Sequence, residues 1–128
     1  MPPEWSYGVT TCQQRLKTLL PRTLSSLAAS GFDSPRLFID GGHEDDAPYC
    51  LPITYRLPNV GAFGNWLLAA WEIYIRQPQA QMYAIFQDDV VLCRGVRQYL
   101  ETCEYPQRGY LNLFTFASNE EMIFDKRG

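Results

Sequence analysis

Residues 83–92 read Tyr-Ala-Ile-Phe-Gln-Asp-Asp-Val-Val-Leu, an apolar run interrupted by two adjacent carboxylates, Asp88 and Asp89. Apolar runs of this length, bounded by polar residues, are typical of buried strands in parallel sheets. Carboxylates are rarely buried unless their charge is compensated, and beyond the carboxyl end of such a strand a bound cation can compensate it. The pair is equally compatible with a β-turn or a helix N-cap that holds two aspartates.

The composition is that of one folded domain. The chain has 128 residues, of which 46% are hydrophobic and 20% charged, so we expect a single domain that spans residues 1–128. The formal net charge is −3, and the basic residues are scattered along the chain. This charge distribution argues against a nucleic acid as partner.

The cysteines and the chain start bear on the cellular compartment. The four cysteines (Cys12, Cys50, Cys93 and Cys103) and the single His43 lack the spacing of a zinc site. Residues 1–5 lack the basic start and apolar core of a signal peptide. The longest apolar-rich stretch, Trp66–Ile75, is too short to span a bilayer. We therefore expect a cytoplasmic protein with reduced thiols and no transmembrane segment.

Hydrophobic patterning predicts strands that alternate with helices. Strands are expected over residues 5–11, 36–40, 53–57, 83–87 and 110–116, and helices over 13–30, 65–76 and 95–103. Pro21 either kinks the first helix or begins a second segment there, and Asn65 is the expected N-cap of the second helix. Trp66, Trp71 and Tyr74 recur at helical spacing and are expected in the core rather than as a sugar-stacking platform. The alternation predicts a three-layer α/β/α fold with a mostly parallel sheet.

The polar residues that follow the predicted strands meet at one edge of such a sheet. Ligands of open α/β sheets bind outside the carboxyl ends of the strands. The strand ends that are brought together there are Thr10-Thr11, Asp40-Gly41-Gly42 and Gln87-Asp88-Asp89.

The chain resembles the nucleotide-binding half of a GT-A glycosyltransferase in the order of these strand-end segments. The matching segments are Val9-Thr10-Thr11 followed by Arg15, Phe38-Ile39-Asp40-Gly41, the glycine-bearing turn Val60–Trp66, and Phe86-Gln87-Asp88-Asp89-Val90. In that family a short acidic motif of the DxD type follows the fourth strand and holds a divalent metal on the diphosphate of the sugar nucleotide. The resemblance covers about residues 5–118.

The resemblance implies a role for each residue of this edge. Asp89, with Asp88, would hold Mn²⁺ or Mg²⁺, and Asp88 would also contact the ribose or metal-bound water. Thr11 and Arg15 would approach the uracil or the phosphates. The remaining nucleotide-binding candidates are Thr10, Asp40 and Gln87, with Asp40 near the base or ribose. The resemblance implies a UDP- or GDP-sugar as the ligand. The cation would then stabilise the negative charge that grows on the diphosphate leaving group.

Two departures from the family pattern keep a second function open. Gln87 stands where many relatives carry Glu, and it adds hydrogen-bonding capacity without charge. Only residues 117–128 follow the predicted fifth strand, where the family places its acceptor-binding half and its catalytic base. Glu120 and Glu121 are the candidates for that base, although with so little chain around them the reading as solvated tail charges is favoured over a catalytic one. The chain is therefore either a glycosyltransferase or a non-catalytic module that binds a sugar nucleotide or serves in assembly.

The apolar segments also predict self-association. The predicted strand 110–116 reads as buried on both faces, which requires a covering layer. We expect a homodimer or larger assembly with this strand or the helix Trp66–Ile75 in the interface. The sequence leaves open the donor sugar, the acceptor and whether transfer is inverting or retaining.

Overall fold

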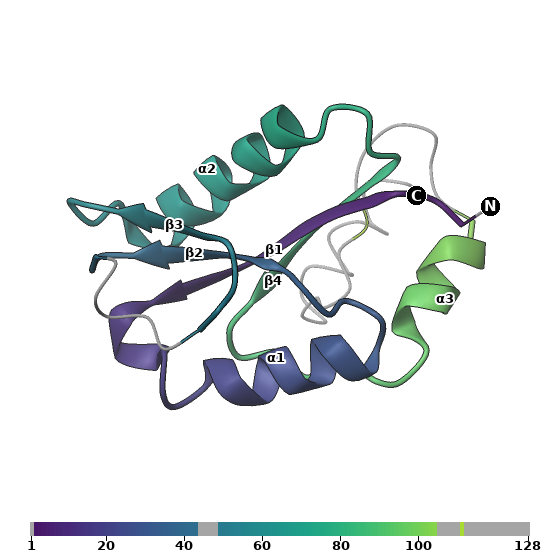
Figure 1. Cartoon of the computed structure of the whole chain (residues 1–128), viewed down its shortest axis with the longest axis horizontal. Helices are drawn as coiled ribbons and strands as arrows, with labels where there is room; N and C mark the ends of the chain where they lie inside the picture. Colours follow the sequence, from purple (N-terminus) through teal and green to yellow (C-terminus); the bar gives the residue numbers. More distant parts are fainter. Residues whose placement is uncertain (1, 44–48, 105–110, 112–128) are drawn as a thin grey trace, which may run out of the picture.

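The fold is a parallel sheet with helices on both faces (Figure 1). The computed structural model describes residues 2–43, 49–104 and 111. Its elements are, in chain order, β1 (Trp5–Cys12), the 3-10 turn η1 (Gln13–Arg15), α1 (Leu20–Ala29), β2 (Arg36–Asp40), β3 (Ile53–Arg56), α2 (Gly61–Arg76), β4 (Met82–Gln87) and α3 (Val96–Thr102). The strands pair in the order β3-β2-β1-β4, and every pairing is parallel. The described part of the chain thus confirms the predicted α/β class with a parallel sheet.

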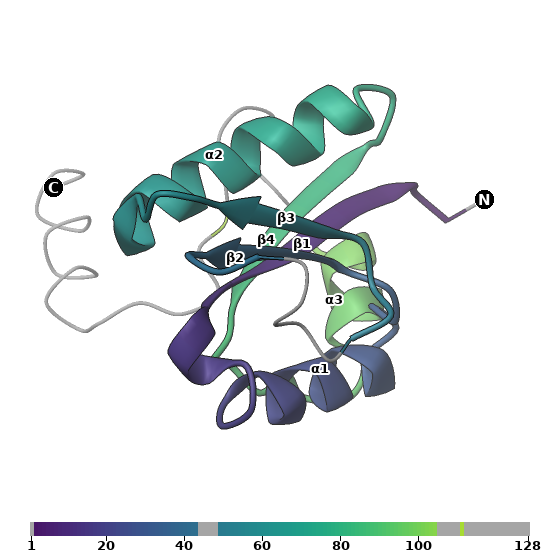
Figure 2. The same ribbon diagram turned by 60° about the vertical axis from the view of Figure 1, so that its left-hand side comes forward.

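The helices divide between the two faces of the sheet, with α2 on one face and α1 and α3 on the other (Figure 2). The larger core lies on the α1 and α3 side and contains Val9, Leu20, Leu27, Phe32, Leu37, Ile39, Phe86 and Leu100. The smaller core on the α2 side contains Phe38, Ala69 and Ile73. This division follows the alternation of side chains along β2, because residues 37 and 39 point to one face and residue 38 to the other.

Glycine at position 8 lets Phe38 lie across the neighbouring strand. A Cβ atom at Gly8 would collide with the Phe38 ring and approach the Arg36 carbonyl oxygen to 2.9 Å. Any larger residue at position 8 would therefore displace Phe38, which is fully buried. The α2 face of the sheet depends on this glycine for its close packing.

The first helix, α1, begins at Leu20, next to Pro21. Pro21 lies in the first turn of α1, so the second of the two expectations for this residue is confirmed. The preceding residues form η1 and a turn instead of a continuous helix. The helix ends as expected at Ser30 and Gly31, where Gly31 takes the left-handed conformation (φ 98°) and the Phe32 N–H donates to the Leu27 carbonyl at 2.8 Å.

The second helix begins four residues earlier than predicted, at Gly61, and Asn65 is not its N-cap. The Asp40 carboxylate at the end of β2 accepts from the backbone N–H groups of Val60 (2.8 Å) and Gly61 (3.0 Å). A distant carboxylate thus caps the helix, and Asn65 is free for another role. Asn65 is buried inside α2 and donates to the Phe38 carbonyl at 2.9 Å, which ties the helix to the sheet.

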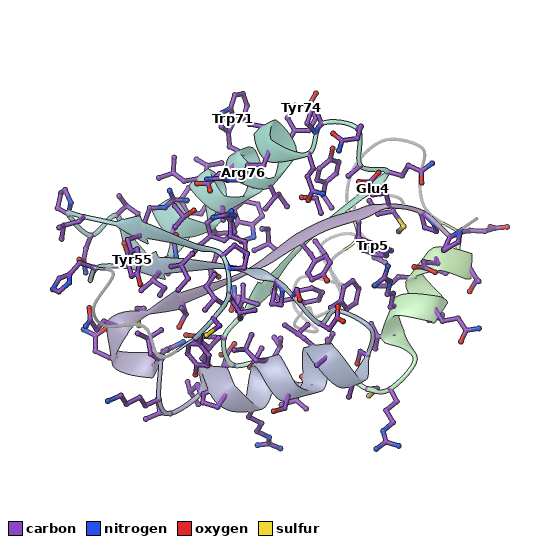
Figure 3. The ribbon with its side chains drawn as sticks, in the orientation of Figure 1. Glu4, Trp5, Tyr55, Trp71, Tyr74 and Arg76 are labelled. Carbon is purple, nitrogen blue, oxygen red and sulfur yellow. The ribbon has the colours of Figure 1, made fainter. Side chains whose placement is uncertain are left out.

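The aromatic residues of α2 are not in the core, which corrects the expectation for Trp66, Trp71 and Tyr74. The buried face of the helix consists of Asn65, Ala69 and Ile73, four residues apart. Trp71 is 67% exposed and Tyr74 54% exposed, and both side chains point away from the sheet in Figure 3. Small residues on the sheet side let the helix approach closely, and the large side chains consequently lie outside.

β4 is less buried than its sequence predicted. Among the described strands it lies at one end of the sheet, so Tyr83 and Gln87 are exposed and only Phe86 is fully buried. The most buried strand is β2 instead. Apart from Leu111, the strand predicted over 110–116 lies outside the described residues. No helix in the described ranges is long and apolar enough to cross a membrane.

Candidate functional site

The predicted site residues lie at the carboxyl edge of the sheet. The register pairs Cys12 with Asp40 and Thr10 with Gln87, so β1 and β2 end at the same level and β4 ends two residues short of it, at the same edge. The sheet extends from β1 through β2 to β3 on one side, and β4 then joins on the opposite side of β1. The boundary between β1 and β4 is therefore a topological switch point, where ligands of open α/β sheets bind.

Asp88 is buried at this switch point and binds one residue at the end of β1 and one residue of η1. The side chain of Asp88 is 4% exposed. Its Oδ2 accepts from the Thr11 hydroxyl at 2.8 Å, and its Oδ1 accepts from Arg15 Nη1 at 2.9 Å. The charge of this carboxylate is therefore compensated by a guanidinium and a hydroxyl of the chain itself. The structure brings Thr11 and Asp88 together at one edge, as the strand order predicted, and it adds Arg15 as a partner of Asp88.

Arg15 remains a cation with part of its surface in solvent. Its side chain is 48% exposed. The hydrogen bond with Asp88 and the charge of Asp88, followed by smaller contributions from Cys12 and Asp89, raise the pKa of Arg15 above its usual value. Because Asp88 fixes one edge of the guanidinium, the remaining N–H groups are held ready for a second anion.

The two aspartates of the motif have different environments. Asp89 is exposed, and so is Gln87, whereas Asp88 between them is buried. Asp89 lies close enough to Arg15 to affect its pKa. Asp89 is thus the carboxylate of this pair that faces solvent.

Of the other predicted site residues, Asp40 already has hydrogen-bond partners within the chain. Both carboxylate oxygens of Asp40 accept hydrogen bonds from the start of α2, and the side chain is buried. Asp40 is therefore at the predicted edge but is engaged as a helix cap. The Thr10 hydroxyl lies 3.5 Å from the Phe86 carbonyl, a long contact that leaves it free to take another partner. Glu120 and Glu121 lie outside the described residues.

Two hydroxyl residues of α1 and the C-cap residue Ser30 bind the segment that follows β4, and sequence reasoning did not identify them. The buried Thr23 hydroxyl lies 2.6 Å from the Asp88 carbonyl and 2.7 Å from the Val90 carbonyl, and its one proton serves one of them at a time. Ser26 Oγ accepts from the Leu92 N–H at 3.1 Å, and Ser30 Oγ donates to the Cys93 carbonyl at 2.9 Å. The signal was available as hydroxyl residues at positions i, i+3 and i+7 within an amphipathic helix.

The described residues offer a cation one exposed carboxylate, so a divalent ion there would need further ligands from a phosphate and water. Asp88 is occupied by Thr11 and Arg15, which leaves Asp89 as the protein carboxylate that can approach a cation. Within residues 2–43, 49–104 and 111 no group of three or more His, Cys, Asp and Glu side chains could hold a metal. Mg²⁺ is commonly held by one or two carboxylates together with waters and substrate phosphates. One carboxylate beside an oriented arginine matches that mode of binding.

Two hollows stand out in the described part of the chain, and neither is lined by Asp88 or Asp89. The smaller one, of about 290 Å³, is lined by Gln13, Gln14, Leu16 and Lys17 and therefore lies beside Arg15 along the chain. The larger one belongs to the opposite edge of the sheet. The candidate site is thus a surface constellation with a shallow hollow next to it.

The chain was compared with models of protein families, with curated proteins and with solved structures. None of the three comparisons found a match.

Proposed function

We propose that the chain binds a sugar nucleotide through a divalent cation at the carboxyl edge of its sheet, and that it is a GT-A-like glycosyltransferase domain. The observation that carries the proposal is Asp88, buried at the switch point and held by Thr11 and Arg15. The order β3-β2-β1-β4 is that of the first four strands of a doubly wound nucleotide-binding sheet. This order supports nucleotide binding in general, and the acidic motif supports the sugar nucleotide.

Arg15 is the residue suited to the phosphates of the ligand. A guanidinium that is fixed at one edge by Asp88 and half exposed at the other can donate two hydrogen bonds to a phosphate group. Thr11 contributes indirectly, because its hydroxyl fixes the Asp88 carboxylate. In this proposal Asp88 orients Arg15 rather than holding the metal.

Asp89 is the residue suited to the cation. When bound, Mn²⁺ or Mg²⁺ stabilises the negative charge that grows on the diphosphate leaving group. Asp89 reaches solvent at the tip of the turn after β4, and Thr23 fixes the backbone of that turn through the Asp88 and Val90 carbonyls. The turn is therefore positioned by α1 before any ligand binds.

A second candidate is a module that binds the sugar nucleotide without transferring the sugar. Of the carboxylates described at the carboxyl edge, Asp40 caps α2 and Asp88 pairs with Arg15. Asp89 is assigned to the cation, so these residues do not supply a separate base for the acceptor hydroxyl. An inverting enzyme requires such a base, and a retaining enzyme does not.

Titration calorimetry with UDP, GDP and their sugars, with and without Mn²⁺, tests the proposal. We expect binding that strengthens with Mn²⁺ and loses this dependence in Asp89→Asn. Arg15→Gln should weaken binding whether or not the metal is added, because it removes a phosphate contact. Asp33→Asn is the matched control, since Asp33 is exposed and precedes β2 at the opposite edge. Equal binding by all three variants would contradict the proposal.

We also propose that the chain self-associates through the outer face of α2. The large exposed apolar residues of that helix are Phe63 (73%), Trp66 (41%), Leu67 (52%), Leu68 (42%), Trp71 (67%), Tyr74 (54%) and Ile75 (56%). An aromatic side chain has a surface of about 150–250 Å². Scaled by the exposed fractions above, these residues together present on the order of 700 Å² of apolar surface. A standard interface takes about 800 Å² from each partner, and monomers rarely expose so large a patch. A second copy of α2, packed across a two-fold axis, would cover this face.

A further inference from the structure

A second cluster of cationic side chains lies at the amino edge of the sheet, opposite the candidate nucleotide site. It surrounds a hollow of about 400 Å³ that is lined by Trp5, Tyr7, Ser34, Arg36, Pro52, Arg76 and Gln77. Trp5 and Arg76 are labelled in Figure 3. The described residues that line the hollow include two arginines and no acidic side chain.

The two arginines of the hollow lack full compensation of their charge. Arg36 Nη1 has a neutral acceptor, the Thr54 hydroxyl, at the long distance of 3.4 Å. Burial and the charge of Arg76 lower the pKa of Arg36 below its usual value, although Glu72 opposes them. Arg76 donates from Nε to Glu72 Oε2 at 2.8 Å, and its side chain is 51% exposed. Two guanidiniums thus share the hollow and repel each other.

The network behind the hollow is short of acceptor oxygens. Glu72 accepts from Arg76, from Arg56 at 3.4 Å and from the Thr54 hydroxyl at 2.6 Å. Two guanidiniums therefore share the Glu72 carboxylate, and the third, Arg36, donates to the Thr54 hydroxyl instead. Within the described residues, Arg56 Nη2 is buried and has no hydrogen-bond partner. A buried unpaired donor is costly, and its presence marks a cluster with more donors than acceptors.

We propose that this hollow is a binding site for a small phosphate ester, with Arg36 and Arg76 holding the phosphate group. A phosphate ester carries a charge of roughly −1.5 to −2 near pH 7, which matches the surplus of positive charge in the cluster. Guanidinium groups hold phosphate through paired, charge-assisted hydrogen bonds. Ser34, Gln77 and the Tyr7 hydroxyl offer further donors, and the Trp5 ring offers an apolar wall for the organic part of the ligand. This site is separate from the proposed nucleotide site and does not depend on it.

Titration calorimetry of the full chain with inorganic phosphate and with phenyl phosphate, at constant ionic strength and without divalent metal, tests the proposal. We expect saturable binding that Arg36→Gln and Arg76→Gln each weaken about tenfold, the loss of one charge-assisted bond. Arg94→Gln is the matched control, because Arg94 is exposed and lies just before α3. Tighter binding of phenyl phosphate would support an ester as the ligand, and equal binding of the two probes would contradict the assignment to an ester.

The location of the bound phosphate decides between the two edges of the sheet. NMR shift changes on phosphate addition should include the Trp5 indole N–H and the Gln77 side-chain amide, and they should persist in Arg15→Gln. Circular dichroism melting of each variant confirms that it is folded. Binding that is lost in Arg15→Gln, or that is unchanged in both Arg36→Gln and Arg76→Gln, would overturn the proposal. Absence of saturable binding up to about 10 mM of either probe would also overturn it.

Discussion

Alanine substitution of the two adjacent aspartates should separate a residue that stabilises the fold from one that serves a ligand. Asp88→Ala removes the acceptor of the Thr11 hydroxyl, and both groups of this 2.8 Å bond are buried. A buried hydrogen bond to a charged group contributes about 1.5–3 kcal/mol. The freed Thr11 hydroxyl has the Cys12 carbonyl at 3.4 Å as a poor substitute. The bond to Arg15 lies toward solvent and adds little because it is screened. We therefore expect the free energy of unfolding to fall by about 2 kcal/mol.

Asp89→Ala should leave the stability almost unchanged. Asp89 is exposed, and surface substitutions of this kind usually change the free energy of unfolding by less than about 0.5 kcal/mol. The same substitution should abolish the effect of Mn²⁺ on nucleotide binding. Urea denaturation followed by far-UV circular dichroism measures the stabilities, and calorimetry measures binding. Asp33→Ala serves as the control for removal of one exposed carboxylate. An Asp89→Ala variant that is destabilised as much as Asp88→Ala would refute this division of roles.

Three further predictions address the helix cap, the α2 face and the pH dependence of stability. Asp40→Ala should lower the free energy of unfolding by about 1–2 kcal/mol, because it removes the cap of α2, and it should leave nucleotide affinity unchanged. Weaker nucleotide binding at constant stability would instead place Asp40 at the ligand. Trp71→Ser should shift the sedimentation coefficient at micromolar concentration from that of a dimer to that of a monomer, and a wild-type monomer would contradict the proposed interface. Burial raises the pKa of Glu72, but hydrogen bonds from Thr54 and Arg76 and the charges of Arg76 and Arg56 outweigh it and hold the pKa below its usual 4.5. The stabilisation by Glu72 is therefore complete above pH 4.5 and is lost as the pH falls through the folded-state pKa. The stability difference between wild type and Glu72→Gln should accordingly stay constant above pH 4.5 and shrink as the pH falls below it.

Local sequence signals predicted much of the described fold. The bounds of β2 came out as predicted, because Arg36–Asp40 is an apolar run closed by two glycines. Pro21 and Gly31 set the ends of α1 through backbone geometry that depends on the residue alone. These features are local, so the sequence was sufficient for them.

Features that depend on contacts between distant residues were missed. Asn65 was expected to cap α2, but Asp40, far away along the chain, supplies the cap. The outward position of Trp71 depends on which face of α2 meets the sheet, and a helix that is apolar on nearly every side does not reveal this.

The candidate site was predicted in position but not in detail. The alternation of strands and helices was enough to bring Thr11 and Asp88 to the same edge. The different environments of Asp88 and Asp89 were not predictable, because they follow from Arg15 reaching back from η1 to the end of β4.

Paramagnetic broadening by Mn²⁺ is the most direct test of the proposed sugar-nucleotide site. The measurement compares amide and side-chain NMR signals of the chain before and after addition of substoichiometric Mn²⁺ in the presence of UDP. We expect the broadening to be concentrated at residues 87–90 and at the Arg15 side chain, and we expect Asp89→Asn to remove it. Broadening that is centred on another part of the chain, or that persists unchanged in Asp89→Asn, would contradict the proposed site.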